Sequence, residues 1–427
     1  MTSTARSVAL EAVRRVTDEG AYSSRLIPAL LSRSGLSERD RALATELAFG
    51  TLRRLPGLDR AIGLRASRPV ARMSPGARAA LRLGAYQIAF TRIPPHAAVG
   101  ESVELAAPRE RGFVNAILRR LADDPPPPPT GEAEEDVSAR TGLAPWAVRE
   151  LRLLLGDDAE LAAEALGERG WLSLRANTCR TSVSALSEAL RAAGLDPRPA
   201  PLHPDCLLLD GGDPARLPGF TDGWFAVQDQ ASAFVVSALD PQPGDRVFDA
   251  CAAPGGKAGH VACLVGASGC VVASDVRPER ASLVRRTAQR LGVRVLTLTQ
   301  DATTPAVRSG FDRVLVDAPC SGIGSARRRP ELLWRPQRAE LSRLAKLQVR
   351  IAVAAADALL PGGRLVYSVC TFPRAETDAV CDALVRHRPE LQPASIDGPD
   401  GPTPRLRLWP HRHGSDGMFV AAFTRRL

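Results

Sequence analysis

The chain has 427 residues, of which 44% are hydrophobic, and it carries a formal net charge of +9. A chain of this length is expected to fold into two or three domains with buried cores. No apolar run reaches the roughly 18 residues that a membrane-spanning helix needs, and the first residues lack the apolar core of a signal peptide. The composition therefore argues against a membrane protein and predicts a soluble protein of the cytoplasm.

Nearly all of the positive charge is arginine, because Lys257 and Lys346 are the only lysines. Arginine binds phosphate through two parallel hydrogen bonds and stacks on bases, so a basic chain favours a polyanionic partner. The bias toward Ala, Arg, Gly and Pro is also typical of a GC-rich genome, in which arginine replaces lysine throughout. A lysine kept against this bias, as at position 257, is expected to have a specific function.

Residues 1–122 are predicted to form an all-helical domain. The segments RDRALATELAFGTLRR and PGARAALRLGAYQIAF repeat apolar residues at i, i+3, i+4 and i+7, the spacing of an amphipathic helix. The proline run of ADDPPPPPT then favours a stiff polyproline II spacer. We therefore expect a Pro-rich linker over residues 123–140.

The next segment, residues 141–230, is expected to be a small α+β unit. GWLSLRANT and DCLLLD have the composition of strands, and SVSALSEALRAAG between them is helical. From residue 231 to residue 427 strands alternate with helices, which predicts a doubly wound α/β domain with a parallel sheet. Ligands of such sheets bind beyond the carboxyl ends of the strands, where the motifs described next are placed.

FDACAAPGGKAGH, residues 248–260, connects the first strand of this domain to a helix. It matches neither G-x-G-x-x-G nor the P-loop, so the usual nicotinamide and nucleoside-triphosphate interpretations fail. Pro254, Gly255 and Gly256 predict a tight turn. Asp275 and Asp301 end the next two strands, where carboxylates can accept hydrogen bonds from ribose and adenine. This pattern favours S-adenosylmethionine; the alternative is that both aspartates only cap helices or form turns.

Cys320 in LVDAPCSG and Cys370 in LVYSVCTF each follow a predicted strand. Cytosine C5 becomes a good nucleophile once a thiolate has added to C6, so methylation of C5 needs a reactive cysteine in a polar, partly open place. Asp317 precedes Cys320 by three residues and can hydrogen-bond N3 and the exocyclic amine of the base. The set predicts a covalent methyl-transfer site for cytosine in RNA; the alternative is a pair of buried core cysteines.

The eight cysteines include no C-x-x-C pair, so zinc-site spacing is absent and free thiols are expected. SARRRPELLWR, residues 325–335, follows the first thiol and combines arginines with a tryptophan, which suits phosphate contacts and base stacking. A solvated basic loop is the alternative. The predicted RNA-binding residues are Arg327, Arg328, Arg329, Trp334 and Arg335.

Four motifs resemble the RNA cytosine-C5 methyltransferases of the NOL/NOP/Sun family: DACAAPGGK, VQDQAS, DRVLVDAPCSGIGSARRRPELLWR and WPHRHGSDGMFVAAF. The whole chain is similar to the bacterial Sun (Fmu) branch, which methylates small-subunit (16S) ribosomal RNA. LRLGAYQIAFTRIPPHAAVGESVELA and RGFVNAILRR resemble the NusB-like RNA-binding domain of that branch. The resemblance implies a class I, Rossmann-like methyltransferase domain that uses S-adenosylmethionine, ribosomal RNA as partner, no metal, and a monomer.

The resemblance also implies roles for individual residues. It assigns the nucleophile to Cys370, product release to Cys320 and stabilisation of the base to Asp317. DNA cytosine methyltransferases use the Pro-Cys thiol as nucleophile and would reverse the two thiols. Val369 stands where the family usually has Thr. The implied cofactor contacts are Cys251, Ala252, Ala253, Pro254, Gly255, Gly256, Lys257, Asp275, Asp301 and Asp317.

Two other functions remain open at this point. The first is a cytosine-C5 methyltransferase that acts on transfer RNA, because related enzymes share the catalytic half. The second is a non-catalytic RNA-binding or assembly factor that keeps the fold.

Overall fold

The computed structural model describes residues 3–427, which form two compact units. The first unit comprises Met1–Arg169 and Ala326–Pro336, and the second comprises Gly170–Ser325 and Gln337–Leu427. The chain thus leaves the second unit after Ser325, contributes a short segment to the first unit and then returns. Among residues 3–427, no helix combines the length and the apolar character needed to cross a membrane.

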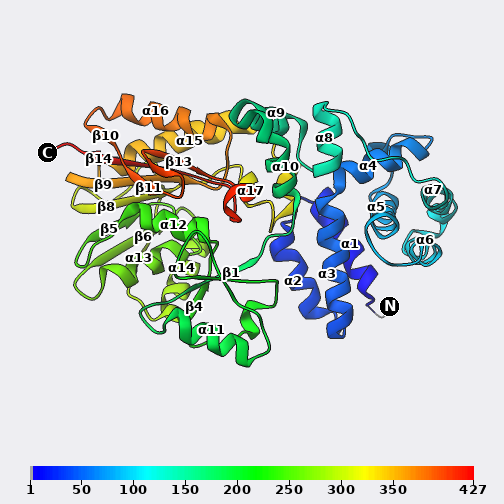
Figure 1. Ribbon diagram of the computed structural model, residues 1–427, viewed down its shortest axis with the longest axis horizontal. Coiled ribbons are helices and arrows are strands. Elements are labelled where there is room, and N and C mark those ends of the chain that lie inside the picture. The colour runs from blue at the N-terminus through cyan, green and yellow to red at the C-terminus, as the bar shows by residue number, and fades with distance from the viewer. Residues whose placement is uncertain (1–2) are drawn as a thin grey trace. The chain divides into compact units, whose positions relative to one another are not determined.

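The first unit is built from helices, as the apolar periodicity predicted, and they are drawn in blue to green in Figure 1. Buried leucines and alanines of α1 to α7, such as Leu47, Leu52, Leu81 and Leu83, share one core. The helices are α1 (Ala5–Asp18), α2 (Ser23–Arg33), α3 (Glu38–Arg53), α4 (Leu55–Arg65), α5 (Pro75–Phe90), α6 (Pro95–Glu104), α7 (Arg111–Asp123), α8 (Glu134–Thr141), α9 (Pro145–Leu155) and α10 (Ala159–Gly167).

The boundary between the two compact units lies after Arg169 and not at the proline run. Helix α8 begins inside the expected linker, and it approaches α4 so closely that a Cβ on Gly57 would lie 2.3 Å from the Ala139 carbonyl oxygen. Because α8 packs with α4, and α9 and α10 pack with α8, residues up to Arg169 belong to the first unit.

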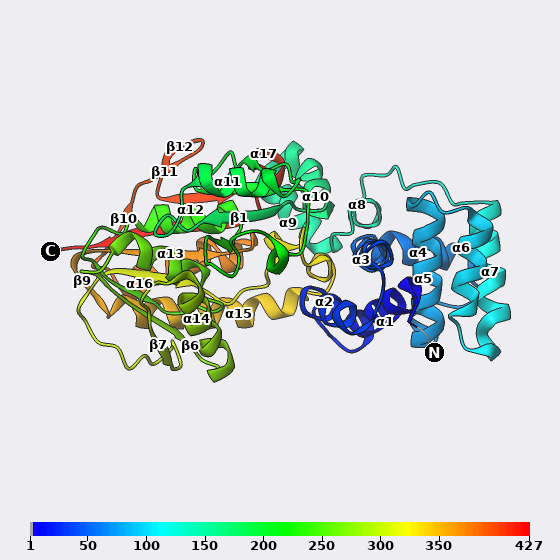
Figure 2. The ribbon, with the colours of Figure 1, turned by 90° about the horizontal axis from the view of Figure 1, so that it is seen from below.

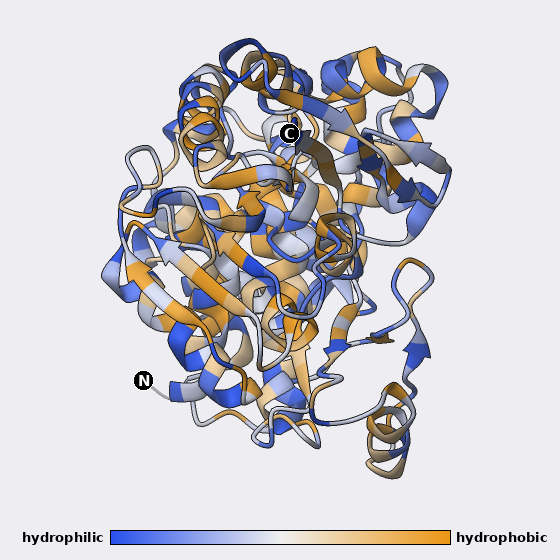
Figure 3. Cartoon of the chain, turned by 90° about the vertical axis from the view of Figure 1, so that its left-hand side faces the viewer, coloured by the Kyte–Doolittle hydropathy of each residue, from blue (hydrophilic) through white to orange (hydrophobic). Residues whose placement is uncertain are grey.

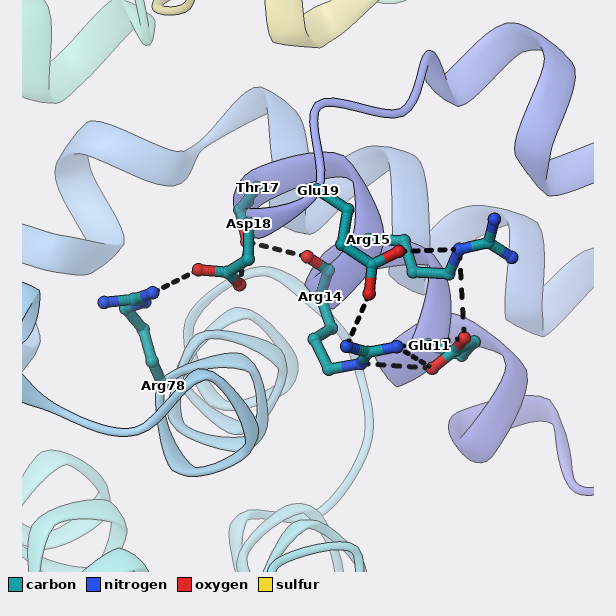
Figure 4. Close-up of polar contacts among 7 residues, drawn as sticks. All are labelled: Glu11, Arg14, Arg15, Thr17, Asp18, Glu19 and Arg78. Atoms are coloured by element: carbon teal, nitrogen blue, oxygen red, sulfur yellow. Dashed lines mark hydrogen bonds and ion pairs between the residues drawn. The ribbon is translucent and has the colours of Figure 1, made fainter.

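Charged side chains at the end of α1 form a surface network, shown in Figure 4. Arg14 donates to Glu11 and to Glu19, and Asp18 pairs with Arg78 of α5. Exposed ion pairs contribute about 0–1 kcal/mol each, so this network adds less to stability than the buried core does.

The second unit begins with a small α+β segment. Its four strands have the order β2-β3-β1-β4, and β1 pairs antiparallel with β3 and β4. Helix α11 covers the sheet through Leu186 and Leu190, which pack against Leu174 and Leu207. The elements are β1 (Leu172–Ala176), α11 (Val183–Ala192), β2 (Arg198–Pro199), β3 (Cys206–Leu209) and β4 (Phe225–Val227).

An eight-stranded sheet forms the rest of the second unit, with the order β10-β14-β9-β8-β5-β6-β7 and β13 paired to β14. Strands β9, β8, β5, β6 and β7 run parallel, whereas β14 is antiparallel to its neighbours. The expected parallel sheet is therefore confirmed, with antiparallel strands added at one edge. The strands are β5 (Arg246–Asp249), β6 (Cys270–Asp275), β7 (Leu296–Thr299), β8 (Phe311–Asp317), β9 (Leu359–Val369), β10 (Leu391–Ala394), β13 (Arg405–Leu408) and β14 (Met418–Arg425); a separate hairpin pairs β11 (Ile396–Gly398) with β12 (Gly401–Thr403).

Helices cover both faces of this sheet, because successive strand residues point to opposite sides. Val247 and Leu315 pack with α12 and α13, whereas Phe248 and Val316 pack with the side that carries α15 and α16. Figure 2 shows α15 as a long helix, and Figure 3 colours stretches of the strands as hydrophobic. The helices are α12 (Gln230–Leu239), α13 (Gly256–Val265), α14 (Pro278–Leu291), α15 (Arg338–Ala356), α16 (Asp378–His387) and α17 (Pro410–His413).

One cysteine pair departs from the expectation of free thiols. Cys179 and Cys263 form a disulfide, while the other six cysteines are free. The pair is 84 residues apart in sequence and joins the segment after β1 to helix α13. Rules based on cysteine spacing detect only local motifs. They could not predict a disulfide between two cysteines that only the fold brings together.

Candidate active site

The loop that the sequence predicted to bind a cofactor follows β5 and forms the predicted tight turn. Gly255 has a φ of +104°, and a Cβ there would lie only 2.9 Å from the Cα of Val284. Its amide donates to the Ala252 carbonyl at 2.7 Å, and α13 begins at the next residue. Only glycine combines this backbone conformation with this close approach to α14. The loop Cys251–Lys257 therefore lies at the carboxyl end of the sheet.

Asp275 and Asp301 lie at the ends of the next two strands. The buried Asp275 accepts hydrogen bonds from the Arg277 amide at 3.2 Å and from Arg280 Nε at 2.9 Å. The exposed Asp301 accepts from the Thr303 amide at 2.8 Å, and this bond lowers the pKa of Asp301. Both carboxylates thus occupy the predicted edge of the sheet, and each also stabilises its own turn.

Lys257 and Asp317 form an ion pair between the loop after β5 and the end of β8. Lys257 Nζ donates to Asp317 Oδ2 at 2.7 Å, and Ser368 Oγ of β9 donates to Asp317 Oδ1 at 2.9 Å. Burial alone would lower the pKa of Lys257, but the Asp317 charge and hydrogen bond and the nearby Cys370 raise it overall. The lysine is therefore a buried ammonium ion, which explains its retention in an arginine-rich chain.

The two thiols meet because β8 and β9 are parallel neighbours in which Asp317 pairs with Ser368. Cys320 Sγ and Cys370 Sγ are 3.5 Å apart, and both side chains are partly accessible. The hydrogen bond with Cys370 and burial raise the pKa of Cys320 well above the ordinary value, so Cys320 keeps its proton. The charge of Cys370 contributes to the raised pKa of Lys257, so this lysine and this thiol interact electrostatically. The thiolate is the reactive form of cysteine.

The predicted RNA-binding segment has structural partners in the first unit. The indole of Trp334 donates to the Leu52 carbonyl at 2.8 Å, and Arg335 donates to the carbonyls of Val16 and Ala21 at 2.7 and 2.8 Å. Arg327 is buried, and Arg328 and Arg329 are half-buried, so none of the five side chains lies in a fully exposed loop. The structure thus gathers Lys257, Asp317, Cys320 and Cys370, while residues 326–336 belong to the helical unit.

Three segments of the chain match known protein families. Residues 3–123 match the NusB family, residues 144–215 match a ferredoxin-like domain described for RsmF/B-like methyltransferases, and residues 236–424 match the family described as 16S rRNA methyltransferase RsmB/F. The ribosomal RNA small subunit methyltransferase B of Salmonella arizonae is 33% identical and covers 99% of this chain and 98% of its own. The chain belongs to the RsmB/F family of 16S rRNA methyltransferases.

Two other proteins are similar to this chain over nearly its full length. A Mycobacterium tuberculosis protein described as a methyltransferase is 38% identical over 99% of this chain and 96% of its own. The solved structure of the protein PH0851 covers 100% of both chains with a TM-score of 0.84 and 25% identity. As a member of the RsmB/F family, the chain is a methyltransferase of small-subunit ribosomal RNA with a NusB-like helical domain and a class I, Rossmann-like catalytic domain.

Trp334 offers a direct test of the two roles for the basic segment. Trp334→Phe keeps an aromatic ring but leaves the Leu52 carbonyl without its donor, which is expected to lower the free energy of unfolding by about 1–2 kcal/mol. The affinity for ribosomal RNA is expected to stay within about twofold, because the indole N–H is already bound to protein. Urea unfolding and RNA titration measure the two effects. A loss of RNA affinity at unchanged stability would show instead that Trp334 stacks on a base.

Asp249 predicts a pH dependence of stability. Burial, followed by the Asp317 charge, raises the pKa of Asp249 to about 7. The unfolded carboxyl ionises near pH 4 and the folded one near pH 7, so this residue's contribution is present below pH 4 and lost as the pH rises to about 7. The loss amounts to at most about 4 kcal/mol. Asp249→Asn is expected to remove this fall in urea unfolding across pH 4–8, whereas Asp222→Asn at an exposed site should keep it.

Two residues of the site were missed from the sequence. Ser368 holds Asp317, and the buried Glu376 accepts hydrogen bonds from Ser321 at 2.9 Å and from Gln348 at 2.9 Å. A serine inside an otherwise apolar strand, and an acidic residue six positions after a thiol, were the available signals. Neither signal reveals its partner without the tertiary structure.

One other cluster bears on the expectation that the protein holds no metal. Ligand atoms of His203, Asp205 and His260 lie within 4.8 Å of one another. His203 Nδ1 already accepts the Asp205 amide at 3.2 Å, and burial lowers the pKa of both histidines. The charge of the buried Arg175 lowers both pKa values further, and the same charge opposes a cation. We therefore assign no metal to this cluster.

Proposed function

We propose that this protein transfers a methyl group from S-adenosylmethionine to C5 of one cytosine in small-subunit ribosomal RNA through a covalent bond between Cys370 and C6. The observation that carries the proposal is the pair of thiols 3.5 Å apart, of which Cys370 interacts electrostatically with Lys257. Thiolate addition to C6 is the chemistry that makes C5 nucleophilic. A buried core pair would need neither the lysine nor the accessibility.

The residues divide the work as follows. The Cys370 thiolate adds to C6, and the Lys257–Asp317 pair hydrogen-bonds the exocyclic amine and N3 as charge develops on the base. When bound, S-adenosylmethionine supplies an electrophilic methyl group to C5. Once the sulfur of Cys370 is bonded to C6, it no longer hydrogen-bonds the Cys320 thiol as a thiolate. The pKa of Cys320 then falls, and its thiol becomes easier to deprotonate. The partly accessible Cys320 then releases its proton to solvent, and the resulting thiolate accepts the C5 proton. The electrons of the C5–H bond reform the C5–C6 double bond, and Cys370 leaves as a thiolate.

The loop Cys251–Lys257, with Asp275, Asp301 and Asp317, is the proposed cofactor site. The turn at Gly255 brings backbone close to the ligand position, and the two strand-end carboxylates suit ribose and adenine. The set contains no phosphate-binding loop, which fits a nucleoside with a cationic group. We place the enzyme in the cytoplasm, where its ribosomal substrate is made, and propose a monomer that needs no metal.

The test incubates purified protein with methyl-labelled S-adenosylmethionine and unmodified 16S ribosomal RNA, with transfer RNA and DNA in parallel. Label at C5 of a single 16S cytosine is the expected result. Label on transfer RNA would keep the chemistry and replace the substrate. Label at another atom of the ribosomal RNA would overturn the covalent mechanism. No label, together with no cofactor binding by calorimetry, would favour the non-catalytic assembly factor.

A further inference from the structure

Glu376 is a fully buried carboxylate that follows the second thiol by six residues. Its Oε1 accepts the Ser321 amide at 2.9 Å and the Gln348 side chain at 2.9 Å, and its Oε2 accepts the Ser321 hydroxyl at 2.5 Å. Burial raises the pKa of Glu376, while the bonds from Ser321 and Gln348 lower it and offset part of that effect. A buried carboxylate with three donors is a costly arrangement that local packing does not require.

The donors connect Glu376 to the chain on both sides of Cys320. Ser321 directly follows Cys320, and Gln348 also donates to the carbonyl of Pro319, which directly precedes it, at 3.0 Å. The loop of Cys370 is held less strongly, because Thr371 shares the Ser321 hydroxyl at 2.7 Å and gives the smallest of the hydrogen-bond effects that lower the pKa of Glu376. Glu376 therefore fixes the backbone beside Cys320 through its stronger hydrogen bonds, and the loop of Cys370 through the weaker contact with Thr371.

We propose that Glu376 is a positioning residue that holds Cys320 where it can accept the C5 proton, and so sets the rate of product release. The inference rests on the proposed function, since it deepens one step of that mechanism. Its specific content is an asymmetry: losing Glu376 should impair the step of Cys320 more than the step of Cys370. Simple support of the fold would slow both steps alike.

The main variant is Glu376→Met in the full chain, which keeps the length of the side chain and removes both acceptors. Its kcat is expected to fall by roughly 10- to 100-fold, because small displacements of a catalytic group cost about that much. The KM for RNA should stay within about twofold. A covalent protein–RNA adduct should accumulate on denaturing gels, as in Cys320→Ala. Glu376→Gln, which still accepts the Ser321 amide, should restore part of kcat and reduce the adduct.

Two further proteins keep the test decisive. Ser321→Ala removes one donor, leaves Glu376 in place and should show a smaller accumulation of adduct even where Glu376→Met folds poorly. Glu340→Gln on the exposed start of α15 is the control and should behave as wild type. Adduct in Cys320→Ala but in neither Glu376→Met nor Ser321→Ala would overturn the positioning role alone. Absence of adduct in Cys320→Ala itself would overturn the proposed function.

Discussion

Replacing Cys370 with alanine is expected to abolish methyl transfer to ribosomal RNA, with a loss on the order of 10⁴-fold or more, as for the removal of other covalent nucleophiles. Without the thiolate no bond forms at C6, and C5 remains too weak a nucleophile to take the methyl group. Binding of S-adenosylmethionine should be unchanged, because the proposed cofactor contacts lie on other strand ends. Methyl-incorporation assays and cofactor calorimetry measure the two quantities.

A matched control for this change is Cys270→Ala. Cys270 is a free, half-buried cysteine at the start of β6, at the opposite end of the strand from the cofactor-side residue Asp275. Its replacement should leave the rate within about twofold of wild type, as is usual for a substitution away from reacting groups. A Cys370→Ala variant that retained more than a few per cent of the activity would contradict the role of nucleophile.

Replacing Cys320 with alanine is expected to give the opposite phenotype, a stable covalent complex with RNA. Cys370 still adds to C6 and the methyl group is still transferred, but nothing accepts the C5 proton, so elimination stalls. Each enzyme should therefore transfer about one methyl group and then stop. Denaturing gels detect the adduct, and the amplitude of a single-turnover burst counts the methyl groups.

The hydrogen bond between the thiols sharpens this expectation. Cys370 raises the pKa of Cys320 through that bond, so Cys320 is the poorer nucleophile of the pair before substrate binds. The double variant that lacks both thiols should form no adduct, which serves as the control. If Cys370→Ala rather than Cys320→Ala trapped RNA, the roles would be reversed, as in the DNA cytosine methyltransferases named above.

Much of the fold followed from local patterns. The apolar periodicity around Leu81 and Leu83 predicted helices, and the alternation of strands and helices after residue 231 predicted the doubly wound sheet. Once the sheet was predicted, Asp317 and Cys320 were expected near the cofactor loop, because parallel strands share their carboxyl edge. These are features that a sequence records within a few tens of residues.

The features that sequence reasoning missed depend on contacts across long stretches of chain. Trp334 bonds to Leu52, 282 residues away, and Glu331 bonds to Ser23, 308 residues away. A segment that was predicted to bind RNA therefore belongs to the helical unit. Glu376 and its partner Ser321 are 55 residues apart in sequence. No local pattern states which distant donor a buried carboxylate will meet.

The most direct test of the covalent mechanism uses wild-type protein, S-adenosylmethionine and a 16S RNA fragment that carries 5-fluorocytidine in place of cytidine. Fluorine at C5 cannot leave as a proton, so the methylated adduct should be trapped without any change to the enzyme. After protease and nuclease digestion, mass spectrometry is expected to find methylated fluorocytidine on the peptide that contains Cys370. Attachment to Cys320, or methylation without any attachment, would contradict the account.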